Sequence, residues 1–392
     1  MSNFENIQSR DQEYVVHSYG RFPVAVEKGK NAVCYDFDGK KYIDMTSGIG
    51  VNALGFCDDG WVAAVTNQLT KLQHISNLYY TDPCSKLAEI LCKRTGMKKA
   101  FFANGGAEAN EGAIKAARKY SFDKYGNGRS TILCLKNSFH GRTVTTLAAT
   151  GQDVFHNYFF PFTEGFEFVE PGDIGALKAH ESGVCAVMME LIQGEGGVLP
   201  VAPEYVKAVE KFCADNDILL IIDEVQTGVG RTGSLYAFQQ YGISPDLVTS
   251  AKGIGGGLPL AAVLFGDKTA NVFNPGDHAT TFGGNPVACA GAVEIMNRLD
   301  DDFLSEVTKK GEYIRERVLK MPHVKGIAGM GLMLGIELED GIKSADIVRA
   351  GIQNGVLLLT AKAKVRLLPP LTITYDDLDQ ALAALEKTLA EA

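Results

Sequence analysis

The chain lacks an excess of positive charge, paired cysteines and long hydrophobic runs, and each absence excludes a class of protein. Its 392 residues carry 38 basic and 47 acidic side chains, a formal net charge of -9, so no positive field exists to hold a nucleic-acid backbone. The eight cysteines never form a CxxC motif, which indicates free thiols in a reducing compartment. No run approaches the roughly 18 uncharged apolar residues of a membrane-spanning helix. We therefore expect a cytoplasmic protein that binds neither nucleic acid nor membrane.

What the chain does have is enough apolar sequence, 46% of its residues, to fill a large core. At roughly 150 residues per domain, the length predicts two or three domains, or one large α/β domain with an appendage. In the middle of the chain, apolar runs without period-2 alternation precede glycine loops and helical patterns, which is typical of βα units around a buried parallel sheet. The expected strands are residues 100–103, 131–135, 184–189, 218–222, 247–250 and 260–265, and the expected helices are 107–120, 204–216 and 286–299.

The sequence changes character near residue 300, where shorter elements follow one another. Here we expect an amphipathic helix at 303–319, strands at 333–338, 356–359 and 364–367, and a closing helix at 376–389. Residues 33–46 contain an Asp-Gly pair that is typical of a β-hairpin turn, and we expect this hairpin to join the C-terminal elements. The predicted organisation is a large domain, residues 56–285, inserted into a small α+β domain made of residues 1–55 and 286–392.

Two charged side chains stand at the ends of expected strands, where ligands of open parallel sheets bind. Asp223 follows the run at 218–222, and Lys252 follows the run at 247–250 and precedes a glycine loop. Taken singly, such an aspartate is as often a helix cap, and such a lysine is usually a solvated turn residue. Their placement at the tips of two strands of one sheet favours a shared function.

Two loops add further groups at the same edge. Residues 104–111, NGGAEANE, predict a glycine turn and a helix start, whose free backbone N–H groups would bind a phosphate. The turn is no GxxxxGK[ST] phosphate loop, and an ordinary βα turn is the alternative. Residues 137–143 offer the ring of Phe139, an imidazole and the guanidinium of Arg142. The alternative there is a core phenylalanine beside a surface arginine.

Together, an amine, a carboxylate, an aromatic ring and a phosphate turn are what pyridoxal 5'-phosphate requires. The set resembles the fold-type I, class III aminotransferases, the family of the ornithine and acetylornithine enzymes, over about residues 19–389. The resemblance implies pyridoxal 5'-phosphate as cofactor, no metal, and a large domain with a mostly parallel seven-stranded sheet flanked by helices plus a smaller α+β domain. The most diagnostic stretches are LLIIDEVQTGVGRTG (219–233), SAKGIGGG (250–257), TFGGNP (281–286), ELIQGEGG (190–197) and VRLLPPL (365–371).

The resemblance assigns the cofactor's reactive ring to four residues. Lys252 is similar to the Schiff-base lysine, which also moves a proton between the substrate carbon and the cofactor. Asp223 is similar to the partner of the pyridinium nitrogen. Gln226 is similar to the residue that hydrogen-bonds the phenolic oxygen, and Phe139 to the stacking ring.

The phosphate turn departs from the family. Where the family commonly has Ser-Gly-Thr, this chain has Gly105, Gly106 and Ala107, so the phosphate would depend on backbone N–H groups and on Thr281. Thr281 matches a threonine that reaches the cofactor of a neighbouring subunit, which implies a homodimer with shared active sites. Residues 55–59, GFCDD, also replace the family's Gly-His-x-His-Pro, which we interpret as a structural motif.

Four residues are implied to select substrates. Arg142 would hold the carboxylate distal to the reacting carbon, and Arg366 the α-carboxylate of glutamate. Glu195 is similar to the residue that neutralises Arg366 while an ω-amine is bound, although a purely structural ion pair is the alternative. Gly48 stands where the ornithine-specific branch has a tyrosine that receives the free α-amino group of the donor. A glycine there leaves room for an acyl cap on that group. The alternative is that Gly48 serves only a backbone turn.

The reaction that the resemblance implies is transfer of the δ-amino group of N2-acetyl-L-ornithine to 2-oxoglutarate, which gives N-acetyl-L-glutamate 5-semialdehyde and L-glutamate in arginine biosynthesis. Succinylornithine, ornithine and 4-aminobutyrate are alternative donors. A non-catalytic regulatory protein that binds pyridoxal 5'-phosphate is the alternative from another class. Such a protein would have no chemical need for Lys252, Asp223 and both arginines together.

Overall fold

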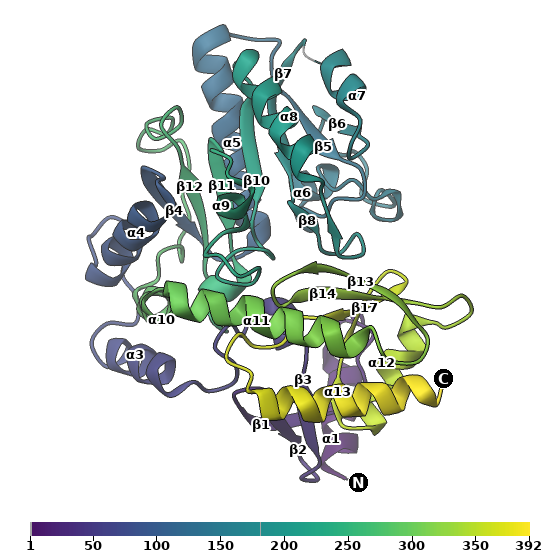
Figure 1. Cartoon of the computed structure of the whole chain (residues 1–392). Helices are drawn as coiled ribbons and strands as arrows, with labels where there is room; N and C mark the ends of the chain where they lie inside the picture. The colour runs from purple at the N-terminus through teal and green to yellow at the C-terminus, as the bar shows by residue number, and fades with distance from the viewer. Residues whose placement is uncertain (1, 181) are drawn as a thin grey trace.

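The computed structural model describes residues 2–180 and 182–392. Its largest element is a seven-stranded sheet with the order β4-β12-β11-β10-β7-β5-β6, in the upper half of Figure 1. The strands run parallel except β12, which is antiparallel to both of its neighbours, β11 and β4. The strand bounds are β4 (Lys99–Ala103), β5 (Thr131–Leu135), β6 (Phe166–Val169), β7 (Val184–Met189), β10 (Leu219–Asp223), β11 (Leu247–Ser250) and β12 (Ala261–Phe265). The expected fold class is confirmed.

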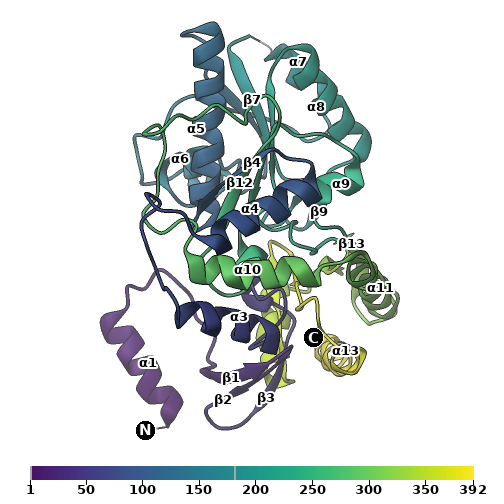
Figure 2. The same cartoon turned by 90° about the vertical axis from the view of Figure 1, so that its left-hand side faces the viewer.

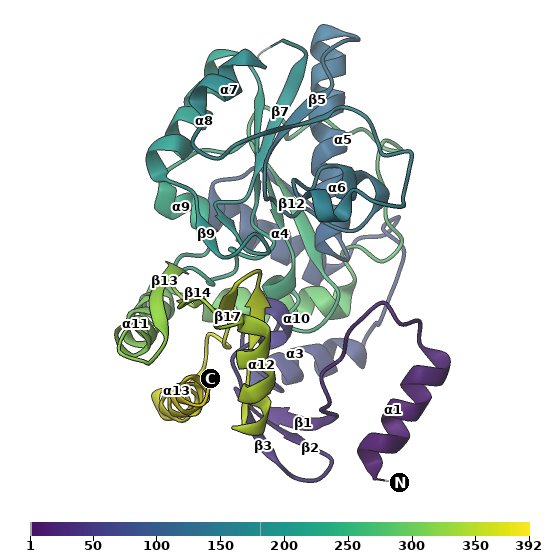
Figure 3. The ribbon, with the colours of Figure 1, turned by 90° about the vertical axis from the view of Figure 1, so that its right-hand side faces the viewer.

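The continuous apolar runs arise because this sheet is covered on both faces. Leu219 and Ile221 of β10 pack in one core cluster with the alanine-rich face of α5 (Gly106–Tyr125). Leu220 and Ile222, which point to the opposite face of the strand, pack in a second cluster with α8 (Pro203–Asp215). Figure 3 shows α5 on one side of the sheet, and α7 and α8 on the other.

The sequence-based bounds of the sheet agree with the structure to within one residue for every expected strand. The prediction missed β6, a four-residue edge strand that pairs only with β5 and is partly exposed, so it has no continuous apolar run. The expected end of the first helix at residue 120 was wrong, since α5 continues to Tyr125 and ends at Gly126. The last turn of α5 lies largely outside the core, so the apolar pattern stops before the helix does.

Two smaller four-stranded sheets lie in the lower half of Figure 1. One has the order β13-β14-β17-β16, and the other has the order β1-β2-β3-β15. The pairing of Val356 with Ile43 confirms that the N-terminal hairpin joins the C-terminal elements. The strand bounds are β1 (Val26–Lys30), β2 (Val33–Asp36), β3 (Lys41–Asp44), β13 (Val324–Met330), β14 (Met333–Leu338), β15 (Val356–Leu357), β16 (Leu359–Ala361) and β17 (Lys364–Leu367).

The single strand expected at 356–359 is wrong, because the chain divides at Leu358 into β15 and β16, which join different sheets. A window of four apolar residues cannot reveal that its two halves pair with different partners. The prediction also missed β13, whose sequence VKGIAGM contains two glycines and is only partly buried. Helices α11 (Asp301–Val318), α12 (Ser344–Gln353) and α13 (Tyr375–Ala390) pack against these small sheets.

Helix α10 (Pro286–Arg298) runs between the two halves of the molecule and packs on α3 (Asp59–Leu69) and α4 (Asp82–Thr95). The buried Arg231 also connects the two halves of the molecule. Its guanidinium donates hydrogen bonds to the carbonyl oxygens of Leu332 at 3.1 Å and Pro369 at 2.5 Å. The domain boundaries at residues 55/56 and 285/286 stay a prediction.

Helix α1 (Asn3–Tyr14) has no buried residue and lies to one side of the lower half in Figure 2. Within residues 2–180 and 182–392, no helix combines the length and the apolar character that crossing a membrane requires. The remaining elements are α2 (Ser47–Gly50), α6 (Val144–Ala148), α7 (Ile174–Ala179), α9 (Ala237–Tyr241), β8 (Ile192–Gln193), β9 (Leu199–Pro200) and the 3-10 turns Asp153–Phe155 and Lys252–Ile254.

Candidate active site

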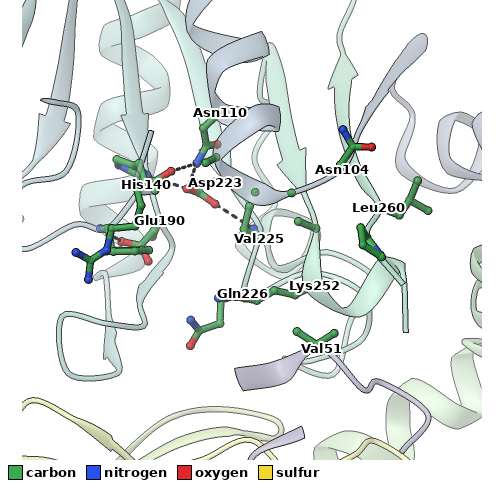
Figure 4. Close-up of a pocket in the computed structure, with 18 of the residues that line it drawn as sticks. Val51, Asn104, Asn110, His140, Glu190, Asp223, Val225, Gln226, Lys252 and Leu260 are labelled. Atoms are coloured by element: carbon green, nitrogen blue, oxygen red, sulfur yellow. Dashed lines mark hydrogen bonds and ion pairs between the residues drawn. The ribbon is translucent and has the colours of Figure 1, made fainter. Parts of the chain in front are cut away.

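The carboxyl ends of the parallel strands surround a cavity of about 490 Å³. Figure 4 shows side chains from the ends of several strands pointing into it. Because parallel strands end at the same edge, residues that are far apart in the sequence meet here. Eight of the predicted site residues line this cavity, namely Gly105, Gly106, Ala107, Phe139, Arg142, Asp223, Gln226 and Lys252.

Asp223 is the last residue of β10 and is only 4% exposed. Its Oδ2 accepts hydrogen bonds from Asn110 Nδ2 and from Nδ1 of the buried His140, both at 2.8 Å. Its Oδ1 accepts the backbone N–H of Val225 at 3.0 Å. Three donors from three parts of the chain thus hold this carboxylate in one orientation at the edge of the sheet (Figure 4).

Lys252 lies directly beyond β11 and lines the same cavity. Its backbone has φ of 49°, a left-handed conformation that costs energy for a non-glycine residue. Burial lowers the pKa of its amine, although the nearby carboxylates of Glu195 and Asp223 act in the opposite direction. A lowered pKa increases the fraction of uncharged amine, the form that can bond to a carbonyl carbon.

The start of α5 offers backbone donors to the cavity. Gly105 is the N-cap and Gly106 the first helical residue, and no side chain caps this end. A Cβ on Gly106 would lie 2.8 Å from Cγ1 of Val225, so the close approach of these two segments requires glycine. The free N–H groups at the positive end of this 20-residue helix can donate hydrogen bonds to a phosphate.

Glu190 follows β7 at this edge, is buried, and connects two loops of the site. Its Oε2 accepts the backbone N–H of Phe139 at 2.9 Å, and its Oε1 accepts the N–H of Gly194 at 3.2 Å. Burial raises its pKa to about 7. Through its two hydrogen bonds, Glu190 connects the loop that carries Glu195 to the segment that carries Phe139.

Arg366 and Glu195 form an ion pair next to the cavity. Nη1 of Arg366 lies 2.6 Å from Oε1 of Glu195 and 3.2 Å from Oε1 of Gln226, a residue that lines the cavity. The side chain of Arg366 is 3% exposed and that of Glu195 is 31% exposed. Burial alone would raise the pKa of Glu195, but the guanidinium of Arg366 brings it below its usual value.

The structure does not bring Thr281 and Gly48 into the cavity of this chain. Thr281 is exposed. Gly48 is exposed within the turn of α2 and has φ of 61°. A Cβ at Gly48 would meet only Nδ2 of Asn52, at 3.8 Å, so space for a larger side chain exists there.

Two buried residues of the site, Asn110 and Glu190, were not singled out from the sequence, and the buried His140 was noted there only as an imidazole of the 137–143 loop, without a role. Glu190 follows a fully apolar run, just as Asp223 does, so the same strand-end argument applies to it. Asn110 lies within α5, and only the tertiary structure places it beside Asp223. The buried Oδ1 of Asn110 and Nε2 of His140 have no hydrogen-bond partner in the described part of the chain, which is consistent with a polar ligand beside them.

The donors, the carboxylate, the ring and the amine together fit a flat, phosphate-bearing aromatic cofactor. The family model of class III aminotransferases matches residues 14–389. The chain is 51% identical over 389 residues to the acetylornithine aminotransferase of Haemophilus ducreyi, covering 99% of each protein. The chain therefore belongs to the class III aminotransferases and is a pyridoxal-phosphate-dependent transaminase.

Other similar proteins are also aminotransferases, and their names specify either acetylornithine or ornithine as the amino-group donor. The acetylornithine aminotransferase of Caldanaerobacter subterraneus is 46% identical, with 97% of this chain and 98% of that protein covered. The ornithine aminotransferase of Toxoplasma gondii superposes with a TM-score of 0.94 at 32% identity, covering 100% of this chain and 96% of that one. The N-acetylornithine aminotransferase of Stenotrophomonas maltophilia gives 0.84 at 33% identity, with 98% of each chain covered. A second Toxoplasma gondii structure is described with partial occupancy of pyridoxal 5'-phosphate at its active site.

Proposed function

We propose that this enzyme transfers the δ-amino group of N2-acetyl-L-ornithine to 2-oxoglutarate, giving N-acetyl-L-glutamate 5-semialdehyde and L-glutamate, in arginine biosynthesis. The observation that carries this proposal is the pair of guanidinium groups near Lys252. Arg366 is neutralised by Glu195, whereas Arg142 lines the cavity. Such a site can accept a donor with one distal carboxylate and an acceptor with two. The acetylornithine aminotransferases among the relatives support the same assignment.

Pyridoxal 5'-phosphate supplies an electrophilic carbon and a ring that withdraws electrons from the reacting carbon of the substrate. In our proposal, the amine of Lys252 holds the cofactor and then removes and returns the proton at the substrate carbon. The carboxylate of Asp223 keeps a proton on the ring nitrogen, and its three hydrogen bonds orient it for that role.

The cofactor's other groups are assigned to residues of the cavity wall. The N–H groups of Gly105, Gly106 and Ala107 bind the phosphate, and this turn itself contributes no side-chain hydroxyl. Phe139 stacks on the ring, and its backbone is held by Glu190. Gln226 donates to the phenolic oxygen.

Two substrates use one site because Glu195 can neutralise or release Arg366. While the δ-amine of the donor reacts, Glu195 neutralises Arg366, and Arg142 binds the donor's distal carboxylate. When glutamate or 2-oxoglutarate binds, its α-carboxylate replaces Glu195 on Arg366, and Arg142 binds the γ-carboxylate. A guanidinium suits both tasks because it presents parallel N–H donors to a carboxylate.

Gly48 selects the acylated donor in this proposal. It offers no hydroxyl to a free α-amino group, and the space around it accommodates an acyl cap. A hydrogen bond to a charged group contributes about 1.5 to 3 kcal/mol, so its absence reduces specificity for free ornithine by at least about tenfold.

We also propose a cytoplasmic homodimer in which Thr281 completes the phosphate site of the partner subunit. The exposure of Thr281 and its position outside this chain's own cavity support that role. Each subunit is proposed to have a large domain at 56–285 and a small domain at 1–55 and 286–392.

A half-reaction screen tests the substrate assignment. The enzyme loaded with pyridoxal 5'-phosphate is mixed with acetylornithine, succinylornithine, ornithine or 4-aminobutyrate, and the change in visible absorbance gives kcat/KM for each donor. We expect acetylornithine to exceed ornithine by at least about tenfold. Comparable values for the two would contradict the assignment, and no spectral change with any donor would favour the non-catalytic regulatory protein.

Hybrid dimers test the shared site. A Lys252→Ala chain is mixed with a Thr281→Ala chain, so that each hybrid has one doubly damaged site and one intact site. Activity should rise above that of either parent variant after subunit exchange. No rise on exchange, or a fully active monomer by sedimentation, would refute the role of Thr281.

A further inference from the structure

Arg142 has an unusual environment for an arginine that lines a ligand cavity. Its guanidinium makes no hydrogen bond or ion pair with any of residues 2–180 and 182–392. Instead, its carbon Cζ lies 4.0 Å from the centre of the Phe155 ring and 5.5 Å from that of Phe139. The two rings contact each other edge to face, with their centres 5.8 Å apart. Arg142 is therefore held by aromatic faces while its N–H donors stay available.

Phe155 is itself attached to the segment that carries Arg142. It ends the 3-10 turn Asp153–Phe155, and its backbone N–H donates to the carbonyl of Gln152 at 3.0 Å. The side chain of Gln152 in turn donates to the carbonyl of Ser138 at 3.1 Å. The backbone of Phe155 is thus connected to the 137–143 segment.

A ring face attracts a guanidinium electrostatically, and the attraction is strongest in flat, stacked arrangements. An exposed arginine without such support samples many rotamers, and binding a carboxylate then has to immobilise it. Stacking leaves the N–H groups at the guanidinium edge free to bind both oxygens of a carboxylate. An ion pair would restrict the side chain equally well, but it would also compete with the substrate.

We propose that Phe155 is a positioning residue for substrate selection: its ring orients Arg142 so that the guanidinium receives the distal carboxylate of either substrate. The inference rests on the proposed role of Arg142. Phe155 acts through Arg142 and is not among the residues that line the cavity. It therefore affects the binding of carboxylates and leaves the chemical step unchanged.

The test compares Phe155→Leu, which removes the ring, with Phe155→Tyr, which keeps it. For Phe155→Leu we expect KM for acetylornithine and the dissociation constant of glutarate, measured by calorimetry on the holoenzyme, to rise about three- to thirtyfold. The kcat should stay within about twofold, and Phe155→Tyr should restore both binding constants. Phe159→Leu is the matched control, because Phe159 is an exposed ring of the same segment whose aromatic neighbour is Tyr158.

A double-mutant cycle separates this inference from the function on which it rests. Arg142→Ala should weaken glutarate binding, and adding Phe155→Leu should weaken it no further. If Arg142→Ala retains full affinity, the proposed role of Arg142 fails and the inference fails with it. If Arg142→Ala loses affinity while Phe155→Leu does not, or if the two losses add, only the positioning role of Phe155 is overturned.

Discussion

Replacing Glu195 with glutamine should shift the enzyme from its ω-amine donor towards glutamate. Burial raises the pKa of Glu195, but the guanidinium of Arg366 brings it below its usual value, so the substitution removes a full negative charge at neutral pH. Arg366 then carries an uncompensated charge in a nearly solvent-free position. That charge attracts the α-carboxylate of glutamate and disfavours the ammonium group of the acylornithine.

The magnitude follows from the geometry of the pair. Two contacts join the side chains, Nη1 to Oε1 at 2.6 Å and Nη2 to Oε2 at 3.3 Å. A hydrogen bond to a charged group contributes about 1.5 to 3 kcal/mol, and the partial exposure of Glu195 places this pair near the lower end because water screens it. We expect the ratio of kcat/KM for glutamate to that for acetylornithine to rise about ten- to thirtyfold.

The assay is the pair of half reactions, followed by visible absorbance in a stopped-flow instrument. Glu89→Gln is the matched control, since it breaks a surface pair with Lys93 whose contact is also 2.6 Å, yet it should leave the ratio unchanged. If the ratio for Glu195→Gln changes by less than about twofold while the protein keeps its melting temperature, the ion pair is structural and the switching role of Glu195 is refuted.

Further predictions concern the catalytic groups, the donor pocket and stability. Lys252→Ala and Asp223→Ala should fold and still lose turnover by about 10³-fold or more, and near-normal steady-state rates would contradict their roles. Gly48→Tyr should narrow the preference for acetylornithine over ornithine about tenfold and lower the melting temperature, because φ of 61° strains a residue with a side chain. Burial raises the pKa of Glu224 to about 7 from 4.5, so the stability that its protonated form contributes below pH 4.5 is lost as the pH rises through 7. The melting temperature of the parent should therefore fall relative to that of Glu224→Gln between pH 5 and 8, and parallel profiles would refute this assignment.

The sequence by itself determined the strands of the large sheet and the edge at which ligands bind. A strand buried on both faces needs an uninterrupted apolar run, so β7, β10 and β11 are visible in short windows of sequence. The same runs mark where each strand ends, which is how Asp223 and Lys252 could be assigned to one edge. The partly exposed edge strand β6 and the glycine-containing strand β13 have no such run and were missed.

Only the tertiary structure decided which side chains meet across that edge. The order of the strands in the sheet, and not the distance along the chain, brings His140 and Asn110 to Asp223 and places Glu190 between Phe139 and Gly194. Leu358 divides one apolar run between two sheets for the same reason. Local sequence patterns indicate which residues are buried and where helices are capped. They do not indicate which distant residue contacts a given side chain, because that depends on how the helices and sheets pack in the folded protein.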